Sequence, residues 1–280
     1  MTRASQPTPA TPPARPQAAG TYIYCVGSAQ PFISGGPLPS VTGIGNSPVR
    51  LVRSGELVAV VSDSPLPEYE ITDDSAMAHE RVVDAAMTHA TVLPMRFGTV
   101  AESDVAIQEE LLRGHHDELA RELDAVRGCA EFGLKVLWEH DHVFSELLAR
   151  DSEIKGLSDA IAGTTTEQTY YERIQLGEAV EAALQQRREQ ETAAIMSRLR
   201  PLAVDVVENQ LIDDMMVLNA AFLIAQNQVA ALRNAVDTLR QSEAGRLIIK
   251  FAGPFAPYNF VRLTEAWQGA MEESADELSR

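Results

Sequence analysis

Short runs of alternating and β-branched apolar residues open the chain, and they predict strands joined by turns. Residues 21–26 (TYIYCV) form the first candidate strand, and a Gly- and Pro-rich segment follows it. Residues 49–53 and 57–62 then flank Ser54-Gly55-Glu56, a spacing typical of a β-hairpin. The valines of the second run favour a half-buried strand. The pattern therefore predicts a small antiparallel sheet at this end of the chain.

Helical spacing of apolar residues takes over after the hairpin. We expect a helix over about residues 73–91, with N-cap oxygens offered by Asp73, Asp74 and Ser75. Residues 94–100 (PMRFGTV) are short and extended. A second helical region is predicted from residue 103 to about residue 128, and Gly114 can break it.

The order of elements changes after residue 128. The predicted elements are a strand at 131–138, a helix at 142–163, a long helix at 167–200, an antiparallel pair at 204–208 and 215–224, a helix at 226–241 and a strand at 246–251. This β-α-β-β-α-β order with a helical insertion is that of a ferredoxin-like sandwich. Residues 185–191 in the long helix are all polar, so we expect them to lie in solvent.

The predicted fold class is therefore α+β with two domains. The N-terminal α+β domain covers residues 21–128, and the C-terminal domain, a modified ferredoxin-like sandwich with a long helical insertion, covers residues 129–261. Residues 1–20 are rich in Pro and Ala, and we expect this tail to be disordered. Residues 262–280 are expected to form an amphipathic tail, with one apolar face made of Leu263, Ala266, Trp267, Ala270 and Met271.

Composition excludes several classes of protein. A hydrophobic fraction of 45% and a charged fraction of 22% are typical of a globular chain. The net charge of -17 disfavours a nucleic-acid partner, because an acidic surface repels phosphate. We predict no membrane span, because the longest uncharged stretch, 215–232, contains polar amides. Neither a signal peptide nor a metal-like cysteine spacing is present, so we expect a cytoplasmic protein with Cys25 and Cys129 as free thiols.

The search for catalytic and metal-binding motifs gives no active site. None of the three lysines stands in a phosphate-binding loop, and no GxSxG nucleophile motif occurs. His79-Glu80 begins like a zinc-protease helix, but Val83 occupies the position of the second histidine. In His140-Asp141-His142, Asp141 is interpreted as a helix N-cap. We therefore predict neither an enzyme, nor a cofactor, nor a bound metal.

Aromatic and apolar residues beside turns are the remaining candidates for function. They occur in 94–98 (PMRFG), near 131–138 (EFGLKVLW) and in 253–260 (GPFAPYNF). Such rings either close the core or form anchors for another protein. The candidate partner-binding residues are Arg96, Phe97, Trp138, Phe255, Pro257, Tyr258 and Phe260.

Four segments, in this order and at this spacing, resemble the gas vesicle protein F/L family (GvpL/GvpF). They are YIYCV at 22–26, HATVLPMRFGTV at 89–100, EFGLKV at 131–136 and GPFAPYNFV at 253–261. The family often has Trp where Phe255 stands. The resemblance implies two α+β domains and an accessory or minor structural role in gas vesicle formation, inside the cytoplasm of a prokaryote. The implied partners are the major, hydrophobic shell protein and other gas vesicle accessory proteins.

Two other functions remain as alternatives from the residues themselves. A small-molecule-binding regulatory protein on a ferredoxin-like platform predicts an apolar pocket with convergent polar groups. An enzyme predicts that His79, His89 and the histidines at 140 and 142 converge in one cleft. Within the binding hypothesis, Arg187-Arg188 of the long helix offers a second candidate contact.

Overall fold

The computed structural model describes residues 20–34, 41–65, 68–165 and 168–262. These residues form two compact units, one made of 20–90 and 95–117 and the other of 91–94 and 118–262. The predicted domain boundary after residue 128 stays a prediction. Except for Gly20 and Arg262, the predicted tails at 1–20 and 262–280 lie outside the described residues.

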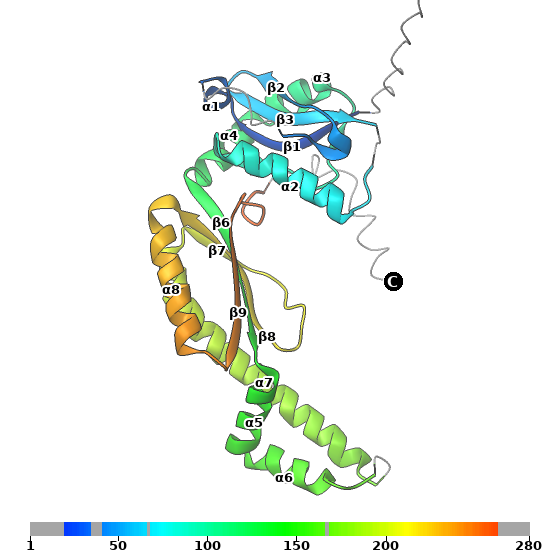
Figure 1. The fold of residues 1–280 in the computed structure, drawn as a ribbon, viewed down its shortest axis with the longest axis vertical. Coiled ribbons are helices and arrows are strands. Elements are labelled where there is room, and N and C mark those ends of the chain that lie inside the picture. Colours follow the sequence, from blue (N-terminus) through cyan, green and yellow to red (C-terminus); the bar gives the residue numbers. More distant parts are fainter. Residues whose placement is uncertain (1–19, 35–40, 66–67, 166–167, 263–280) are drawn as a thin grey trace, which may run out of the picture. The chain divides into compact units, whose positions relative to one another are not determined.

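Mixed helices and strands follow one another along the chain (Figure 1). In the first part these are β1 (Gly20–Ser28), α1 (Ala29–Ser34), η1 (Ile44–Asn46), β2 (Val49–Ser54), β3 (Leu57–Ser64), α2 (Asp73–Met87), β4 (Val92–Pro94), β5 (Val100–Ala101), α3 (Asp104–Ala106) and the π-helix η2 (Ile107–Arg113). Then come α4 (His116–Ala125), β6 (Cys129–Trp138), α5 (His140–Arg150), α6 (Ser152–Ile161), α7 (Tyr170–Leu199), η3 (Arg200–Leu202), β7 (Asp205–Glu208), β8 (Met216–Ala225), η4 (Gln226–Gln228), α8 (Val229–Ser242) and β9 (Leu247–Phe255).

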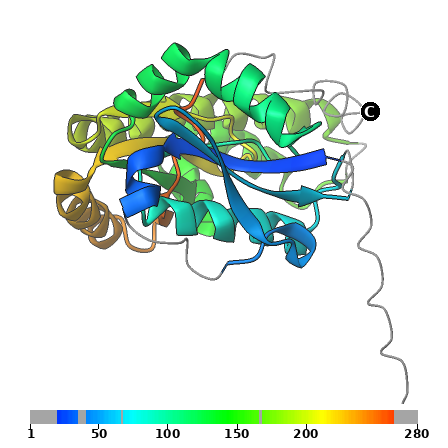
Figure 2. The same ribbon diagram turned by 90° about the horizontal axis from the view of Figure 1, so that it is seen from above.

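The sheet of the first unit is built on the predicted hairpin. β2 pairs with β3 and β3 with β1, all antiparallel, and β5 also pairs with β1. Residues 20–27 of β1 are all buried, because helical segments cover both faces of the sheet. α2 packs against β1, and η2 packs against β2 and β3, on the other side of the strands (Figures 1 and 2). The predicted hairpin is confirmed.

One helix boundary in this part of the chain differs from the expectation, and the break at Gly114 agrees with it. The N-cap of α2 is Thr72, whose hydroxyl accepts a hydrogen bond from Ser75 N at 3.2 Å, while Ser75 Oγ accepts one from Thr72 N at 3.0 Å. The predicted cap among residues 73–75 was therefore wrong. The expected helix from residue 103 is interrupted at Gly114, where a Cβ atom would lie 2.3 Å from the carbonyl oxygen of Glu110.

The second unit is organised around a four-stranded antiparallel sheet. Its strand order is β7-β8-β6-β9, with α5, α6 and α7 inserted between β6 and β7 and α8 between β8 and β9. α7 and α8 cover one face of this sheet, while α5, α6 and the start of α7 extend beyond it (Figure 1). The predicted pairing of β7 with β8 is confirmed.

The core of the second unit lies between the sheet and these helices. Every second residue of β6 contributes to it, and the facing side chains come from α7 and α8. The members that fix this geometry are Phe132, Leu134, Val136 and Trp138 from β6, Leu184, Ile195 and Leu199 from α7, and Leu232, Val236 and Leu239 from α8.

The polar middle of α7 lies only partly in solvent. The Arg187 and Glu191 side chains are each only 14% exposed and pair with one another at 2.9 Å. Arg187 also pairs with Glu146 of α5, and Glu191 with Arg246 before β9. The expectation of a solvated segment holds for Gln185, Gln186, Glu189 and Gln190, which are exposed. It was wrong for Arg187 and Glu191, because oppositely charged residues from two other parts of the chain meet them.

The N-cap residue of α5 also differs from the predicted one. Glu139, and not Asp141, is the N-cap residue, and its carboxylate accepts a hydrogen bond from His142 N at 2.9 Å. Asp141 lies in the first turn of the helix, where a negative charge is favourable without capping it.

Candidate functional site

The candidate segment at residues 253–260 begins inside the last strand of the second unit. β9 was expected to end at residue 251 but continues to Phe255, which is paired with Glu131 of β6. At Gly253 φ is +133°, and a Cβ atom there would lie 2.7 Å from Cδ1 of Phe132 and 2.8 Å from the carbonyl oxygen of Glu131. Glycine therefore allows the two strands to approach closely at this point.

A buried carboxylate holds the turn that follows β9. Glu131 is 6% exposed, and its Oε2 accepts a hydrogen bond from Asn259 N at 2.9 Å while its Oε1 accepts one from Asn259 Nδ2 at 2.6 Å. Burial raises the pKa of this carboxyl group, and the two hydrogen bonds from Asn259 act in the opposite direction. The turn is thus fixed to the sheet by a residue far away in sequence.

The four candidate residues of this segment differ in exposure. Phe255 is 38% exposed, whereas Pro257 is buried. Tyr258 and Phe260 are half-buried. Phe255 is therefore the ring that is most available to a partner, on a backbone held by strand pairing on one side and by Glu131 on the other.

Behind the turn, aromatic packing supports the strand. Phe132 and Phe251 stack with their ring centroids 5.5 Å apart, and the guanidinium of Arg233 lies 5.5 Å from the centroid of Phe132. Phe132 is buried and Phe251 partly buried, so these rings belong to the core that carries Phe255.

Arg96 and Phe97 belong to the first unit. Arg96 is exposed, and Phe97 is half-buried with its ring 6.3 Å from that of Tyr22 and 5.9 Å from that of His79. The hydroxyl of Tyr22 accepts a hydrogen bond from Gly98 N at 2.9 Å. The segment is therefore tied to β1, and Arg96 is its accessible member.

Trp138 lies inside the core of the second unit. It is 2% exposed, its Nε1 donates a hydrogen bond to Glu191 Oε2 at 2.8 Å, and the guanidinium of Arg188 is 5.3 Å from its ring centroid. Arg188 in turn donates to the carbonyl oxygens of Met216 and Asp214, at 3.0 Å and 2.7 Å. Sequence reasoning could not separate this ring from Phe255, because both stand beside turns.

The candidate histidines have separate surroundings. His79 is buried, its Nδ1 lies 3.0 Å from the hydroxyl of Tyr22, and burial lowers its pKa to about 4. The ring of His89 stacks on Phe32 with centroids 6.1 Å apart. His140 and His142 are not buried and lie at the start of α5. In the part of the chain that the structure describes, no group of three or more His, Cys, Asp and Glu residues is arranged to hold a metal ion.

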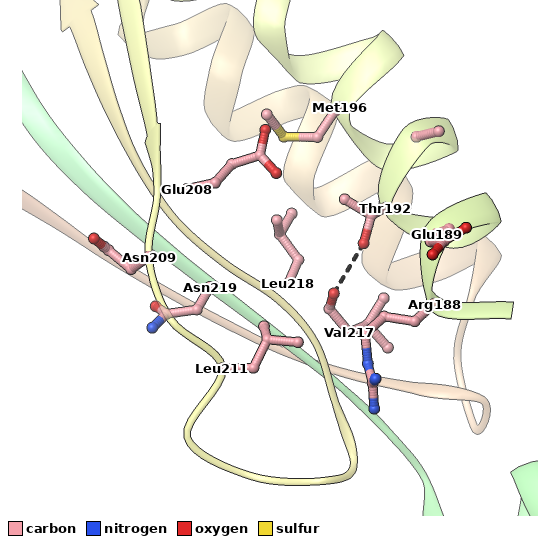
Figure 3. Close-up of a pocket in the computed structure, with 11 residues that line it drawn as sticks. Arg188, Glu189, Thr192, Met196, Glu208, Asn209, Leu211, Val217, Leu218 and Asn219 are labelled. Carbon is pink, nitrogen blue, oxygen red and sulfur yellow. Dashed lines mark hydrogen bonds between the residues drawn. The ribbon is translucent and has the colours of Figure 1, made fainter. Parts of the chain in front are cut away.

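A hollow of about 400 Å³ lies between α7, the end of β7 and the first half of β8 (Figure 3). Several polar side chains around it already bind other groups of the protein. Thr192 donates to the carbonyl oxygen of Val217 at 2.9 Å, Asn219 to that of Gln210 at 2.8 Å, and Glu208 pairs with Arg200 at 2.9 Å. These groups are therefore occupied, which leaves little of the convergent polarity expected of a ligand site.

None of the helices in the described ranges is long and apolar enough to cross a membrane. The structure is a mixed α/β protein with two antiparallel sheets and a long helix, and this arrangement matches solved structures. One is the crystal structure of the gas vesicle protein GvpF from an Anabaena species, with a TM-score of 0.74 at 24% identity, covering 89% of this chain and 100% of that chain. Another is that of GvpF from Microcystis aeruginosa, with a TM-score of 0.71 at 25% identity, covering 88% and 100%.

Sequence comparison leads to the same group of proteins. Gas vesicle protein F of a Streptomyces species is 32% identical over 246 residues, which cover 86% of this chain and 99% of that protein. Gas vesicle protein L1 of Halobacterium salinarum is 26% identical over 257 residues, covering 86% and 90%. The family described as gas vesicle synthesis protein GvpL/GvpF matches residues 20–262. The chain belongs to this family.

Proposed function

We propose that this protein acts in gas vesicle formation as an accessory or minor structural protein. In this proposal it binds the hydrophobic shell protein and other gas vesicle accessory proteins during assembly, at the gas vesicle within the cytoplasm of a prokaryote. The observation that carries the proposal is the family match over residues 20–262. The motifs that resemble the family include residues 253–261, the segment that contains the exposed ring of Phe255.

The physical basis for binding is the contrast between a charged body and an apolar anchor. A net charge of -17 keeps a carrier from associating with itself while it holds an apolar client. Aromatic side chains on a rigid backbone dominate many protein interfaces, because they bury a large area and lose little conformational entropy. Phe255 has both a large aromatic ring and a rigid backbone, and Tyr258 and Phe260 lie close to it in sequence.

We also propose that the second unit is a modified ferredoxin-like sandwich with a helical insertion. The support is the element order β6-(α5-α6-α7)-β7-β8-α8-β9 together with a fully antiparallel four-stranded sheet. Such a platform does not by itself specify a function. The binding proposal therefore depends on the family and on the turn after β9.

A co-purification experiment tests the role of the turn. The shell protein is produced together with this chain, and the amount captured is compared with that captured by Phe255→Ala. We expect a fall of about tenfold, because an interface anchor is worth about 1 to 2 kcal/mol or more. Tyr171→Ala is the matched control, because Tyr171 is 76% exposed on α7. Undiminished capture by a folded Phe255→Ala protein contradicts the role of this ring.

A genetic experiment tests the proposed role as a whole. Deletion of the gene in a vesicle-forming host is expected to abolish or reduce vesicles seen by electron microscopy, and the wild-type gene is expected to restore them. Blotting purified vesicles for the protein then separates a shell component from a factor that acts only during assembly. Normal vesicles in the deletion strain contradict the proposal.

A further inference from the structure

A groove lies between the middle of α7 and the loop that joins β7 to β8 in the second unit. The hollow of about 400 Å³ is lined by Met196 of α7 and by Leu211 of that loop (Figure 3). A second hollow of about 740 Å³ is also lined by Arg188 and Leu211, so the two adjoin. We call them together the α7 groove and define it by residues 188–196 and 208–219.

The floor of the α7 groove is apolar, and large apolar side chains are exposed at its mouth. Met196, Val217 and Leu218 line it and are buried. On the loop, Leu211 is 42% exposed and Ile212 is 71% exposed. A single exposed isoleucine is ordinary on a protein surface. Two such side chains beside a hollow with an apolar floor are typical of a surface that binds another protein.

The basic residue in the lining is held inside the protein. Arg188 Nε donates to the carbonyl oxygen of Met216 at 3.0 Å, Nη2 to that of Asp214 at 2.7 Å, and Nη1 to Gln185 Oε1 at 2.8 Å. Its guanidinium also lies 5.3 Å from the ring centroid of Trp138 in the core. Arg188 therefore shapes the groove and is not positioned to bind an acidic partner.

Negative charges remain on both walls of the α7 groove. Glu189 stands on α7, whereas Asp213 and Asp214 stand on the loop, and all three are exposed. None of the three belongs to an ion pair among the described residues. Glu208, a fourth carboxylate of the lining, is paired with Arg200 at 2.9 Å. An occupant must therefore combine an apolar surface with positive charges at its two edges.

This combination selects one kind of occupant. A second copy of the chain would bring its own carboxylates to a two-fold contact, and any other face of that copy belongs to a protein of net charge -17. An amphipathic helix with basic residues on each side of its apolar stripe matches the groove in both respects. The stretch 188–196 is about 12 Å long, which accommodates about two helical turns.

We propose that the α7 groove binds a basic amphipathic helix of a partner protein. The apolar face of that helix covers Leu211, Ile212 and the groove floor. Its lysine or arginine side chains pair with Glu189 on one wall and with Asp213 and Asp214 on the other. This contact is separate from the turn that contains Phe255, and the proposal does not rest on the gas vesicle role.

Binding of a synthetic peptide to the full chain tests the chemistry of the occupant. The probe is a fluorescent peptide of about 18 residues, made of leucine and lysine at helical spacing, which is long enough to form a helix. The comparison peptide has glutamate in place of every lysine. We expect fluorescence anisotropy to show at least about tenfold tighter binding of the lysine peptide. Equal affinities, or no binding of the lysine peptide, overturn the proposal.

Charge removal tests the place of binding. The triple variant is Glu189→Gln/Asp213→Asn/Asp214→Asn, and its amides keep the side-chain oxygens that accept hydrogen bonds from Gln185 and from Met215 N. We expect the lysine peptide to bind it about 3- to 30-fold more weakly, because three exposed ion pairs are lost. Unchanged affinity of the folded variant, as checked by circular dichroism, overturns the proposal.

A matched variant separates local pairing from attraction to the net charge. The control is Glu153→Gln/Asp159→Asn/Glu178→Gln, which removes the same number of exposed carboxylates from α6 and α7 outside the groove. We expect it to change the affinity by less than about twofold at 0.15 M salt, where distant charges are screened. A loss as large as that of the groove variant would contradict the assigned position.

The apolar contact is tested by one substitution with its own control. Ile212→Ser should weaken binding of the lysine peptide about 3- to 10-fold, because an exposed side chain that the helix would cover is shortened. Ile174→Ser is the control, because Ile174 is 42% exposed on α7 outside the groove. Equal affinity of the folded Ile212→Ser protein and the control overturns the apolar part of the proposal.

Sedimentation equilibrium of the chain without peptide tests the competing occupant. We expect the association state of the wild type and of Ile212→Ser to be the same, because the groove is open to a partner. A dimer that Ile212→Ser dissociates would assign the α7 groove to a second copy of the chain and overturn the proposal.

Discussion

Gly253 is the residue at which β9 comes closest to β6. We expect Gly253→Ala to lower the free energy of unfolding by about 2 to 4 kcal/mol, because alanine is strained at positive φ and its Cβ would collide with the ring of Phe132. Urea denaturation measures this change. Gly133→Ala is the control, because a Cβ there meets nothing within 4 Å. A loss of stability in the control as large as that in Gly253→Ala would contradict the explanation.

The buried carboxyl group of Glu131 leads to a prediction about the pH dependence of stability. Burial raises its pKa above the ordinary value of 4.5, against the lowering by the hydrogen bonds from Asn259. The folded state then binds this proton more tightly than the unfolded state does, so the contribution of Glu131 to stability falls as pH rises from about 4.5 through the raised pKa. Glu131→Gln removes this titration.

The difference in unfolding free energy, wild type minus Glu131→Gln, should therefore decrease between about pH 4 and pH 8. Urea denaturation across that range measures it, and Glu153→Gln, at an exposed position of α6, controls for the loss of one negative charge. A difference that grows with pH would show that the hydrogen bonds outweigh burial.

The elements of the second unit are joined by the charge network at the middle of α7. Glu191 accepts from Trp138 Nε1 and pairs with Arg187 and Arg246. Glu191→Ala leaves an indole N–H and two guanidinium groups without this partner in a largely buried place. We expect a loss of about 2 to 4 kcal/mol in thermal or chemical denaturation. Arg198→Ala, at an exposed position of the same helix, should change stability by less than about 0.5 kcal/mol.

A comparison of the predicted elements with the observed ones shows what the sequence could predict. The hairpin of β2 and β3 and the pair of β7 and β8 follow from local alternation and turn residues, so their positions were correct within a few residues. Arg187 and Glu191 in the polar middle of α7 were misplaced because their partners, Glu146 and Arg246, are distant in sequence. The local pattern describes a side chain and its neighbours along the chain. Burial depends on the side chains that another element packs against it.

Prediction of the candidate site from the sequence has the same limit. Sequence reasoning named seven residues, but it could not rank Phe255 above Trp138, because composition beside a turn is the same for both. The role of Glu131 was also missed, since its contact with Asn259 spans 128 residues. A buried carboxylate within a strand indicates a specific polar partner, but the burial of Glu131 is recognised only from the coordinates.

For the molecule as a whole, apolar contacts and charged contacts with a client respond differently to salt. Ion pairs at exposed lysines are screened as the Debye length shortens from about 10 Å at 0.1 M to about 3 Å at 1 M ionic strength. Burial of apolar groups is not weakened in this way, and excluded salts such as sulfate strengthen it. Salt therefore distinguishes capture of an apolar client through Phe255 from capture through charged side chains.

We expect capture of the shell protein to persist or to increase between 0.1 M and 1 M ammonium sulfate. Capture is measured on the full-length protein, and Phe255→Ala should remove the salt-resistant part of it. Capture that falls as the salt concentration rises would mean that the client is held by charge. In that case charged side chains of this acidic protein, with its net charge of -17, would be the contact with the partner in place of the ring of Phe255.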